Sequence, residues 1–434
     1  MKTQALSLLG TTRLLSRSDG SFQAKADFAT GARPFAVAIA DVDRNGKPDW
    51  LVANSAGGSA SVVLNKTSFA PIGKFSAAAY VLDYGYPGVI AAGNINNDGK
   101  PDLILIDIPG GEINTFLGQG NGSFSYRKDT GYSGSFGMTE QGDLNNDGKP
   151  DLVTVSEIPT YGQLGVSLGN GDGTFAAPTR YSAGAMPRNL QIGDLNRDGK
   201  ADVLVTDDFR EYVHIFLGNG SGSLTAQPDF LINATGSTAT HATGVNLLAL
   251  GDLNNDGKLD AAISIETQDS SKTTHYFIRL LLGNGDGTLT AKAGDISARE
   301  PAYQGTLKLA QLNADAHLDM LQGNADGTVS VWLGQGNGNF TANGTYTASS
   351  SDTLISVADI NADNRADLVA TNYAGSAISV FLGTGNGSFL GKIDYSIDSH
   401  PTGVEISDFN RDGKPDLAAI TFFGAIAIFS NGMP

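Results

Sequence analysis

Nearly half of the acidic residues in this chain belong to one short pattern, whose clearest copy is DLNNDGKPD at 143–151. We call this nine-residue segment the Asp loop. Positions 1, 3 and 5 alternate with other residues, so a curling loop can turn all three side chains inward. Calcium takes about six to eight oxygen ligands, including backbone carbonyls. The pattern therefore predicts a calcium site, in which position 6 makes the turn, position 7 adds its carbonyl and the Asp at position 9 closes the shell.

A metal-free turn rich in Asp and Asn is the alternative interpretation. The eight copies hold 22 of the 45 acidic residues, with two or three in each copy. Carboxylates this close together repel one another unless a cation compensates their charge. Up to eight divalent ions would nearly cancel the net charge of −17. Charge therefore favours bound calcium.

The Asp loops mark an internal repeat that starts every 53, 49, 51, 58, 59, 48 and 49 residues. Short runs of Val, Ile, Leu and Phe between turn residues indicate four strands in each unit. A period near 50 is typical of a propeller. We predict an all-β fold, a single β-propeller domain over 1–434 with eight four-stranded blades, or seven as the alternative. The eight loops span 41–49, 94–102, 143–151, 194–202, 252–260, 311–319, 359–367 and 408–416.

A second pattern, which we call the Gly turn, joins the third strand of a unit to the fourth. Its glycines supply the positive φ that tight hairpins require. A phosphate-binding loop would need a helix directly after the glycines, whereas here a strand follows. Calcium-binding β-helix repeats recur every nine residues, not every fifty. We therefore interpret these segments as hairpins. They span 117–124, 168–175, 217–224, 282–289, 333–340 and 382–389.

The two ends of the chain complement each other. The chain ends in AIAIFSNG, which we interpret as the third strand of the eighth unit, without a fourth strand. The segment DGSFQAKADFATG from Asp19 is similar to the Gly turn and fourth strand of the other units. We expect this N-terminal strand to join the last blade and close the ring, which leaves no open edge. Residues 1–18 are then an extra segment without a predicted place.

The chain resembles the FG-GAP and VCBS repeat family over roughly residues 19–434. That family includes the propeller of integrin α chains and several lectins. The resemblance implies calcium between the first and second strands of each unit. Carried over by position, it implies the following ligands: Asp41, Asp43, Asn45, Asp49, Asn94, Asn96, Asp98, Asp102, Asp143, Asn145, Asp147, Asp151, Asp194, Asn196, Asp198, Asp202, Asp252, Asn254, Asp256, Asp260, Asn313, Asp315, Asp319, Asp359, Asn361, Asp363, Asp367, Asp408, Asn410, Asp412 and Asp416.

Three loops depart from the pattern. Asn94 replaces the first Asp of the second loop, which keeps an oxygen but loses a charge. The sixth loop begins with Gln311 and has Ala316 at the turn and His317 at position 7, so we expect it to bind calcium most weakly. Asn364 at the turn of the seventh loop is a milder departure from the pattern, because Asn tolerates the left-handed conformation.

Composition excludes several classes of partner. The chain has no cysteine, so a metal must be held by oxygen or imidazole. A net charge of −17 argues against nucleic acid and anionic membrane surfaces. No apolar run reaches the roughly 18 residues of a transmembrane helix. A secretion signal is not evident in the sequence, but the resemblance implies an extracellular or cell-surface location.

We interpret the calcium as structural, and we predict no catalytic residues. The five histidines lie in different repeats and outside any catalytic motif. Ligands are expected on the side opposite the Asp loops, where the connections vary most in length. Tyr84, Tyr86, Tyr132 and Tyr303 are the ligand-binding candidates there, since aromatic faces stack against sugar rings. Tyr181, Tyr346 and Tyr395 recur in the fourth strand and are expected in the core.

Three functional classes remain. The first is a binding or adhesion module for carbohydrate or a protein partner, which the resemblance favours. The second is a polysaccharide lyase or other glycan-active enzyme, for which His241, Arg299 and Tyr303 are the only candidates. The third is a structural or assembly subunit, in which the extra N-terminal strand mediates self-association by pairing with another molecule.

Overall fold

The computed structural model describes a large part of the chain. None of the described residues is helical, so none of them provides a membrane-spanning helix. Regular structure in this part of the chain consists of strands alone. The described residues are 13–15, 27–28, 34–40, 42, 49–54, 59–65, 75–81, 87–99, 102–107, 113–118, 124–129, 135–158, 161–207, 212–232, 241–302, 306–351, 353–361, 363–397, 400–407, 415–421 and 426–430.

Each repeat folds into strands in the predicted order, and position 9 of the Asp loop begins the second strand in all eight. The first strands are β3 (Pro34–Ala40), β7 (Pro87–Gly93), β11 (Ser135–Gly142), β15 (Pro187–Gly193), β20 (His241–Gly251), β25 (Leu307–Ala310), β29 (Ile355–Ala358) and β33 (Pro401–Ser407). The second strands are β4 (Asp49–Asn54), β8 (Asp102–Asp107), β12 (Asp151–Ile158), β16 (Asp202–Asp207), β21 (Asp260–Gln268), β26 (Asp319–Gly323), β30 (Asp367–Asn372) and β34 (Asp416–Thr421).

The third and fourth strands complete the units. The third strands are β5 (Ser59–Asn65), β9 (Ile113–Gly118), β13 (Tyr161–Ser167), β17 (Tyr212–Gly218), β22 (Thr274–Gly283), β27 (Thr328–Gly334), β31 (Ala377–Phe381) and β35 (Ile426–Ser430). The fourth strands are β6 (Phe75–Val81), β10 (Phe124–Asp129), β14 (Thr179–Ser182), β18 (Leu224–Ala226) with β19 (Phe230–Leu231), β23 (Leu289–Ala291) with β24 (Ile296–Ala298), β28 (Phe340–Thr347) and β32 (Ile393–Ser396).

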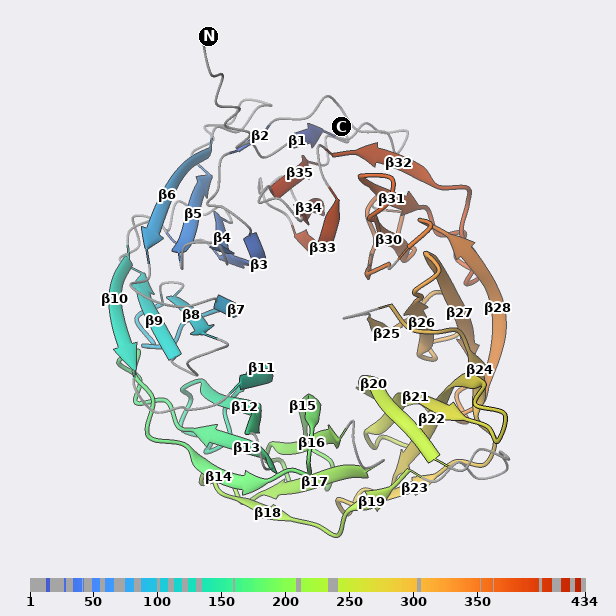
Figure 1. The fold of residues 1–434 in the computed structure, drawn as a ribbon, viewed down its shortest axis with the longest axis horizontal. Coiled ribbons are helices and arrows are strands. Elements are labelled where there is room, and N and C mark those ends of the chain that lie inside the picture. Colours follow the sequence, from blue (N-terminus) through green and yellow to red (C-terminus); the bar gives the residue numbers. More distant parts are fainter. Residues whose placement is uncertain are drawn as a thin grey trace.

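The described strands form eight sheets that are arranged in a ring (Figure 1). In seven sheets the strands follow chain order, from the first strand near the centre of the ring to the fourth at its outside. In the eighth sheet, β33, β34 and β35 are followed by strands from the N-terminal end of the chain. In the fourth and fifth sheets the outer strand is divided, since β18 and β19 both pair with β17, and β23 and β24 both pair with β22. The fold is therefore all-β and propeller-like.

The N-terminal part of the chain joins the last sheet. β2 (Asp27–Phe28) pairs antiparallel with β35, with Phe28 opposite Ile426. This is the strand that was predicted to join the last unit. β1 (Arg13–Leu15) pairs with the same strand in parallel, with Arg13 opposite Ile428. The extra N-terminal segment, for which the sequence predicted no place, thus contributes a strand to this sheet.

The core lies between neighbouring sheets rather than within one sheet. Val203 and Val205 of β16 pack in a cluster with Val153 and Leu164 of the third sheet, whereas Leu204 packs in a cluster with residues of the fifth sheet. Successive side chains of a strand point to opposite faces, so each second strand contributes to two neighbouring interfaces. Burying a Val or Leu contributes about 1.5–3 kcal/mol, which makes these interfaces the main stabilising contact of the ring.

Tyrosines of the fourth strands fasten one sheet to the next. The Tyr181 hydroxyl accepts a hydrogen bond from the N–H of Leu224 at 2.9 Å, and its ring lies 5.9 Å from that of Phe216. Tyr346 contacts the following sheet in the same way, through the N–H of Phe389. Tyr395 is buried in a hydrophobic cluster. The prediction that these three tyrosines belong to the core is confirmed.

Candidate metal centres

The Asp loops lie on one side of the ring, which we call the loop side, because each connects a first strand to a second strand. The third, fourth, fifth and sixth loops are described in full, the second and seventh in part. Asp49 and Asp416 begin β4 and β34. The other predicted ligands of the first and eighth loops lie outside the described residues, namely Asp41, Asp43, Asn45, Asp408, Asn410 and Asp412.

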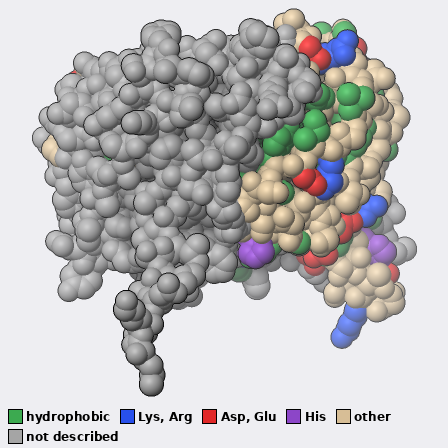
Figure 2. All heavy atoms as spheres, turned by 90° about the horizontal axis from the view of Figure 1, so that it is seen from above, with side chains coloured by type: hydrophobic (Ala, Val, Ile, Leu, Met, Phe, Trp, Pro, Cys, Tyr) green, Lys and Arg blue, Asp and Glu red, His purple; other side chains and the backbone are tan. Residues whose placement is uncertain are grey.

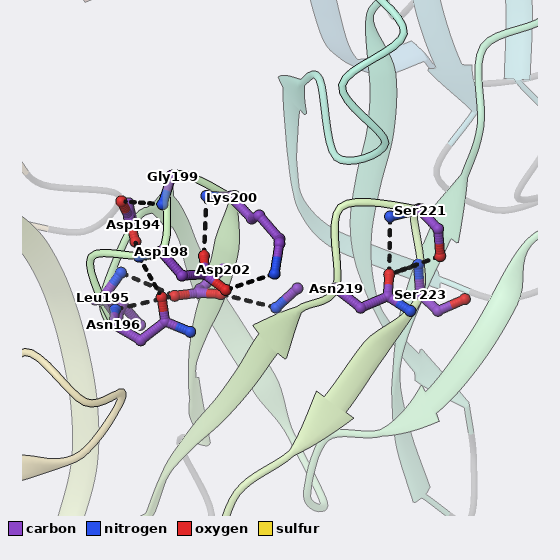
Figure 3. A network of polar contacts seen from close by, with 11 residues as sticks. Asp194, Leu195, Asn196, Asp198, Gly199, Lys200, Asp202, Asn219, Ser221 and Ser223 are labelled. Carbon is purple, nitrogen blue, oxygen red and sulfur yellow. Dashed lines mark hydrogen bonds and ion pairs between the residues drawn. The ribbon is translucent and has the colours of Figure 1, made fainter.

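The fourth loop shows how side-chain oxygens converge (Figure 3). The N–H of Asp198 donates to Oδ1 of Asp194 at 3.1 Å and to Oδ1 of Asn196 at 2.9 Å. The N–H of Gly199 donates to the other oxygen of Asp194 at 2.9 Å. Positions 1 and 3 therefore hold their oxygens beside one backbone nitrogen. The third and fifth loops repeat all three hydrogen bonds.

Position 9 has a second role that sequence reasoning missed. Asp202 is fully buried, and its Oδ2 accepts the N–H of Leu195 at 2.9 Å. Its Oδ1 accepts the N–H of Gly218, the first glycine of the Gly turn, at 2.7 Å. One carboxylate therefore links the Asp loop to the Gly turn of the same sheet. The same pair of hydrogen bonds recurs at Asp151, Asp260, Asp319 and Asp367.

Burial raises the pKa of these position 9 carboxyl groups, and the backbone hydrogen bonds offset the effect only in part. The pKa of Asp367 rises to about 6. Neighbouring carboxylates add to the shift, as Asp147 and Asp143 do at Asp151. The ionised form of position 9 thus lacks a compensating positive charge.

Position 7 supplies a cation to position 5. The Lys200 ammonium lies 2.8 Å from Oδ2 of Asp198, and the N–H of Lys200 donates to Oδ1 of the same carboxylate at 3.0 Å. The hydrogen bond from the ammonium lowers the pKa of Asp198. Lys149 and Lys258 hold Asp147 and Asp256 in the same way, each at 2.9 Å. The sequence analysis considered only the carbonyl of position 7.

The donor set fits calcium. Positions 1, 3 and 5 of the third, fourth and fifth loops offer carboxylate and amide oxygens only, which are the ligands that this hard cation prefers. Within the described residues, no three Asp, Glu or His side chains come together as a metal cluster. The physical reason is the same in the second to seventh loops: position 3 is an Asn, and the position 9 carboxylate is turned toward backbone N–H groups. The calcium sites remain a prediction.

The departing loops differ in geometry as well as in sequence. In the second loop, Asn94 keeps the role of position 1, since its Oδ1 accepts the N–H of Gly99 at 3.1 Å. Asn364 adopts φ 61° and donates to Asp359, as glycine does in the intact loops. In the sixth loop, the Gln311 amide instead donates to the carbonyl of Ala316. An acceptor at position 1 is therefore replaced by a donor in the sixth loop.

In the fourth to seventh sheets, the Gly turn links its sheet to the preceding one. In the Gly turn of the fourth sheet, the third glycine, Gly222, has φ 80° and donates its N–H to the carbonyl of Leu144, in the Asp loop of the third sheet, at 3.2 Å. A Cβ added to Gly222 would overlap the Leu168 side chain of that sheet. Gly287, Gly338 and Gly387 donate to Leu195, Leu253 and Leu312 in the same way. The co-occurrence of the Asp loop and the Gly turn in six of the eight repeats was the available signal of this coupling.

The four ligand-binding candidates for the side opposite the Asp loops, Tyr84, Tyr86, Tyr132 and Tyr303, all lie outside the described residues. Tyr373, another aromatic residue that the sequence places on this side, is described and forms a pair with His400. The rings of Tyr373 and His400 stack with centroids 4.6 Å apart and an interplanar angle of 20°. His400 Nδ1 lies 2.7 Å from the Tyr373 carbonyl, which links the seventh sheet to the connection before the eighth.

Of the three lyase candidates, the structure describes His241 and Arg299, and it does not bring these two together. His241 begins β20 at the inner edge of the fifth sheet, whereas Arg299 follows β24 at the outer edge, with β21 and β22 between them. Arg299 forms an ion pair with Asp326. His214 is a packed side chain, since it is buried and its Nδ1 lies 2.7 Å from Asp229. These positions supply no converging catalytic group among the described residues.

Described side chains of both charges lie on the surface seen in Figure 2, where Asp and Glu alternate with Lys and Arg around an apolar area.

The ring of sheets, the Asp loops and the Gly turns together define a β-propeller-like repeat protein. Six matches to the FG-GAP-like repeat model cover most of the sequence, and the chain belongs to this family. The matched residues are 42–105, 94–154, 143–205, 194–263, 311–370 and 359–419.

Solved structures resemble the fold at low sequence identity. A protein from Lactobacillus plantarum has a TM-score of 0.52 at 11% identity, covering 76% of this chain and 90% of that one. An Agrocybe aegerita lectin that recognises non-reducing terminal N-acetylglucosamine has a TM-score of 0.46 at 19% identity, with 90% of both chains covered. BBS1N in complex with ARL6DN has a TM-score of 0.48 at 11% identity, with 92% of both covered. Of these three, only the Lactobacillus plantarum protein has a TM-score above 0.5, and this similarity concerns the fold alone. No curated protein matches the sequence significantly.

Proposed function

We propose that this protein is an extracellular binding module whose ring is stabilised by calcium in the Asp loops. Calcium accounts for the paired oxygens of positions 1 and 3 and for the uncompensated charge at position 9. The opposite side of the ring binds carbohydrate or a protein partner. The main support for that assignment is the stacked Tyr373–His400 pair, which lies at a junction between two sheets.

The two sides of the ring suit different tasks. On the loop side, position 9 carboxylates accept backbone N–H groups within a sheet, and backbone N–H groups of the Gly turns bond to carbonyls of the preceding sheet. On the opposite side, the connections differ in size: the fifth sheet extends β21 and β22 into a hairpin with its turn at 269–273, whereas the seventh sheet turns at 373–376. Variable connections on a fixed scaffold are typical of ligand-binding sides.

A glycan array tests the binding function. We expect the wild-type chain to bind a defined set of sugars, and the Tyr373→Ala variant to bind them about tenfold more weakly, since a buried aromatic contact contributes roughly 1–2 kcal/mol. Leu390→Ala is the matched control, because Leu390 is exposed (54%) and follows the Gly turn on the loop side. If the ligand is a protein, the chain should bind no sugar on the array and should bind a cell-surface protein instead. Sugar binding that is unchanged in Tyr373→Ala contradicts the assignment of this pair.

We also propose that the ring is a closed propeller of eight blades, with β2 as the closing strand of the last. The pairing of Phe28 with Ile426 supports this closure. We expect deletion of residues 1–33 to expose the edge of β35, to lower the melting temperature and to promote self-association, because an unpaired edge recruits other strands. Deletion of residues 1–18 alone, which removes β1 and keeps β2, is the comparison. It should lower the melting temperature less and promote self-association less, because β2 stays paired with β35. Equal melting temperatures and a monomeric state for the two deletions would contradict closure by β2. Differential scanning fluorimetry and light scattering measure both quantities.

A further inference from the structure

The cation at position 7 of the Asp loop is held in place by two independent contacts. Its ammonium contacts the position 5 carboxylate, at 2.8–2.9 Å in three loops. Its aliphatic stem lies against the second glycine of the Gly turn, where a Cβ on Gly220 would come within 2.9 Å of Lys200 Cδ. Gly171 and Gly285 accommodate Lys149 and Lys258 in the same way. The lysine is therefore positioned by the fold and is not merely a nearby surface charge.

Residue 7 occupies both oxygens of the position 5 carboxylate. In the third loop, Oδ1 of Asp147 accepts the backbone N–H of Lys149 at 2.9 Å, and Oδ2 accepts its ammonium at 2.9 Å. Calcium binds carboxylate oxygens at about 2.3–2.6 Å. An ion that enters the loop must therefore displace the ammonium from Oδ2 or share that oxygen against electrostatic repulsion.

We propose, resting on the calcium function above, that the lysine at position 7 is a built-in competitor that sets the calcium affinity of its loop. In the metal-free loop the ammonium compensates the position 5 charge. In the loaded loop the ion takes that oxygen and the ammonium moves to solvent, which it reaches easily because the side chains of Lys149, Lys200 and Lys258 are 34%, 36% and 29% exposed. Each loop thus exchanges one cation for another.

The seventh and sixth loops provide natural contrasts. Arg365 holds Asp363 at 3.8 Å, a longer contact than any of the three lysines makes. His317 instead contacts Asn255 of the preceding loop through Nδ1. Among the described position 7 side chains, the competitor is therefore strongest in the third, fourth and fifth loops, which also have the full set of Asp and Asn donors.

The test is calcium titration of the full chain in which Lys149, Lys200 and Lys258 are all replaced by Met. Met keeps an apolar stem against the glycine and removes only the ammonium. We expect the calcium dissociation constant of these loops to fall about three- to fivefold by isothermal titration calorimetry, the range for loss of one partly exposed ion pair. We also expect a lower melting temperature in EDTA, because the metal-free loops lose their internal cation.

The matched control replaces the same three lysines by Arg, which keeps the positive charge at the longer distance that Arg365 shows. It should lower the calcium dissociation constant less than the Met variant does, by at most about twofold. A Gln triple variant provides a second neutral side chain and should behave as the Met variant does. If both neutral variants bind calcium with the affinity of the wild-type chain, the lysine is not a competitor, while the proposed calcium function stands. Absence of any calcium binding by the wild-type chain overturns the proposed calcium function itself.

Discussion

Excess EDTA is expected to lower the melting temperature of this protein by roughly 10 °C. At a free calcium concentration of a hundred times the dissociation constant, one site stabilises the native state by about 2.7 kcal/mol. The three loops described in full with complete donor sets then contribute about 8 kcal/mol together. Unfolding entropy near 2.1 cal/mol/K per residue, over 434 residues, converts this to roughly 10 °C.

Differential scanning calorimetry in calcium and in EDTA measures the shift, and re-addition of calcium should restore the higher melting temperature. A variant with Asp143, Asp194 and Asp252 replaced by Ala is the matched test, because each removes the position 1 acceptor of one loop. Its melting temperature should depend far less on calcium. A wild-type melting curve that is identical in calcium and EDTA would show that the Asp loops are metal-free turns.

The second large effect concerns position 9. We expect Asp260→Ala to lower the free energy of unfolding by about 3–5 kcal/mol, because it leaves two buried N–H groups, those of Leu253 and Gly283, without their acceptor. Each unsatisfied buried donor costs about 1–3 kcal/mol. Urea denaturation followed by fluorescence or circular dichroism measures the change.

Asp286→Ala is the matched control for this substitution. Asp286 lies in the Gly turn of the same sheet and is exposed, and it accepts hydrogen bonds from the Thr288 N–H and hydroxyl only. We expect its removal to change the free energy of unfolding by less than about 1 kcal/mol. The difference between the two variants should persist in EDTA, since the partners of Asp260 are backbone groups. If Asp260→Ala destabilises only in calcium, position 9 acts through the metal alone.

Much of this architecture could be predicted from the sequence, because the repeat reports it eight times. The period indicated the number of units, and alternating apolar runs indicated the strands, such as β12 and β13 of the third unit. The N-terminal strand was predicted from its similarity to a Gly turn, and β2 pairs with β35 as expected. These features depend on patterns that are local in sequence.

The features that could not be predicted depend on contacts between segments whose spacing varies. The carboxylate of Asp202 meets the N–H of Gly218 only after a hairpin has brought the loop and the turn together. Asp260 and Gly283 make the same contact across a longer hairpin, so no fixed sequence spacing signals it. The parallel pairing of Arg13–Leu15 with β35 has no counterpart in the other units, and a repeat pattern therefore cannot reveal it.

The hydrogen bond between a Gly turn and the preceding Asp loop, such as Gly222 to Leu144, joins two backbone groups. Each of the four described junctions of this kind therefore uses one backbone donor and one backbone acceptor, whatever side chains the repeats have elsewhere. A gene that gains or loses a whole repeat leaves the remaining junctions chemically unchanged. Rings of this kind can thus change their number of units by duplication or deletion, while the side chains on the opposite side diverge toward new ligands.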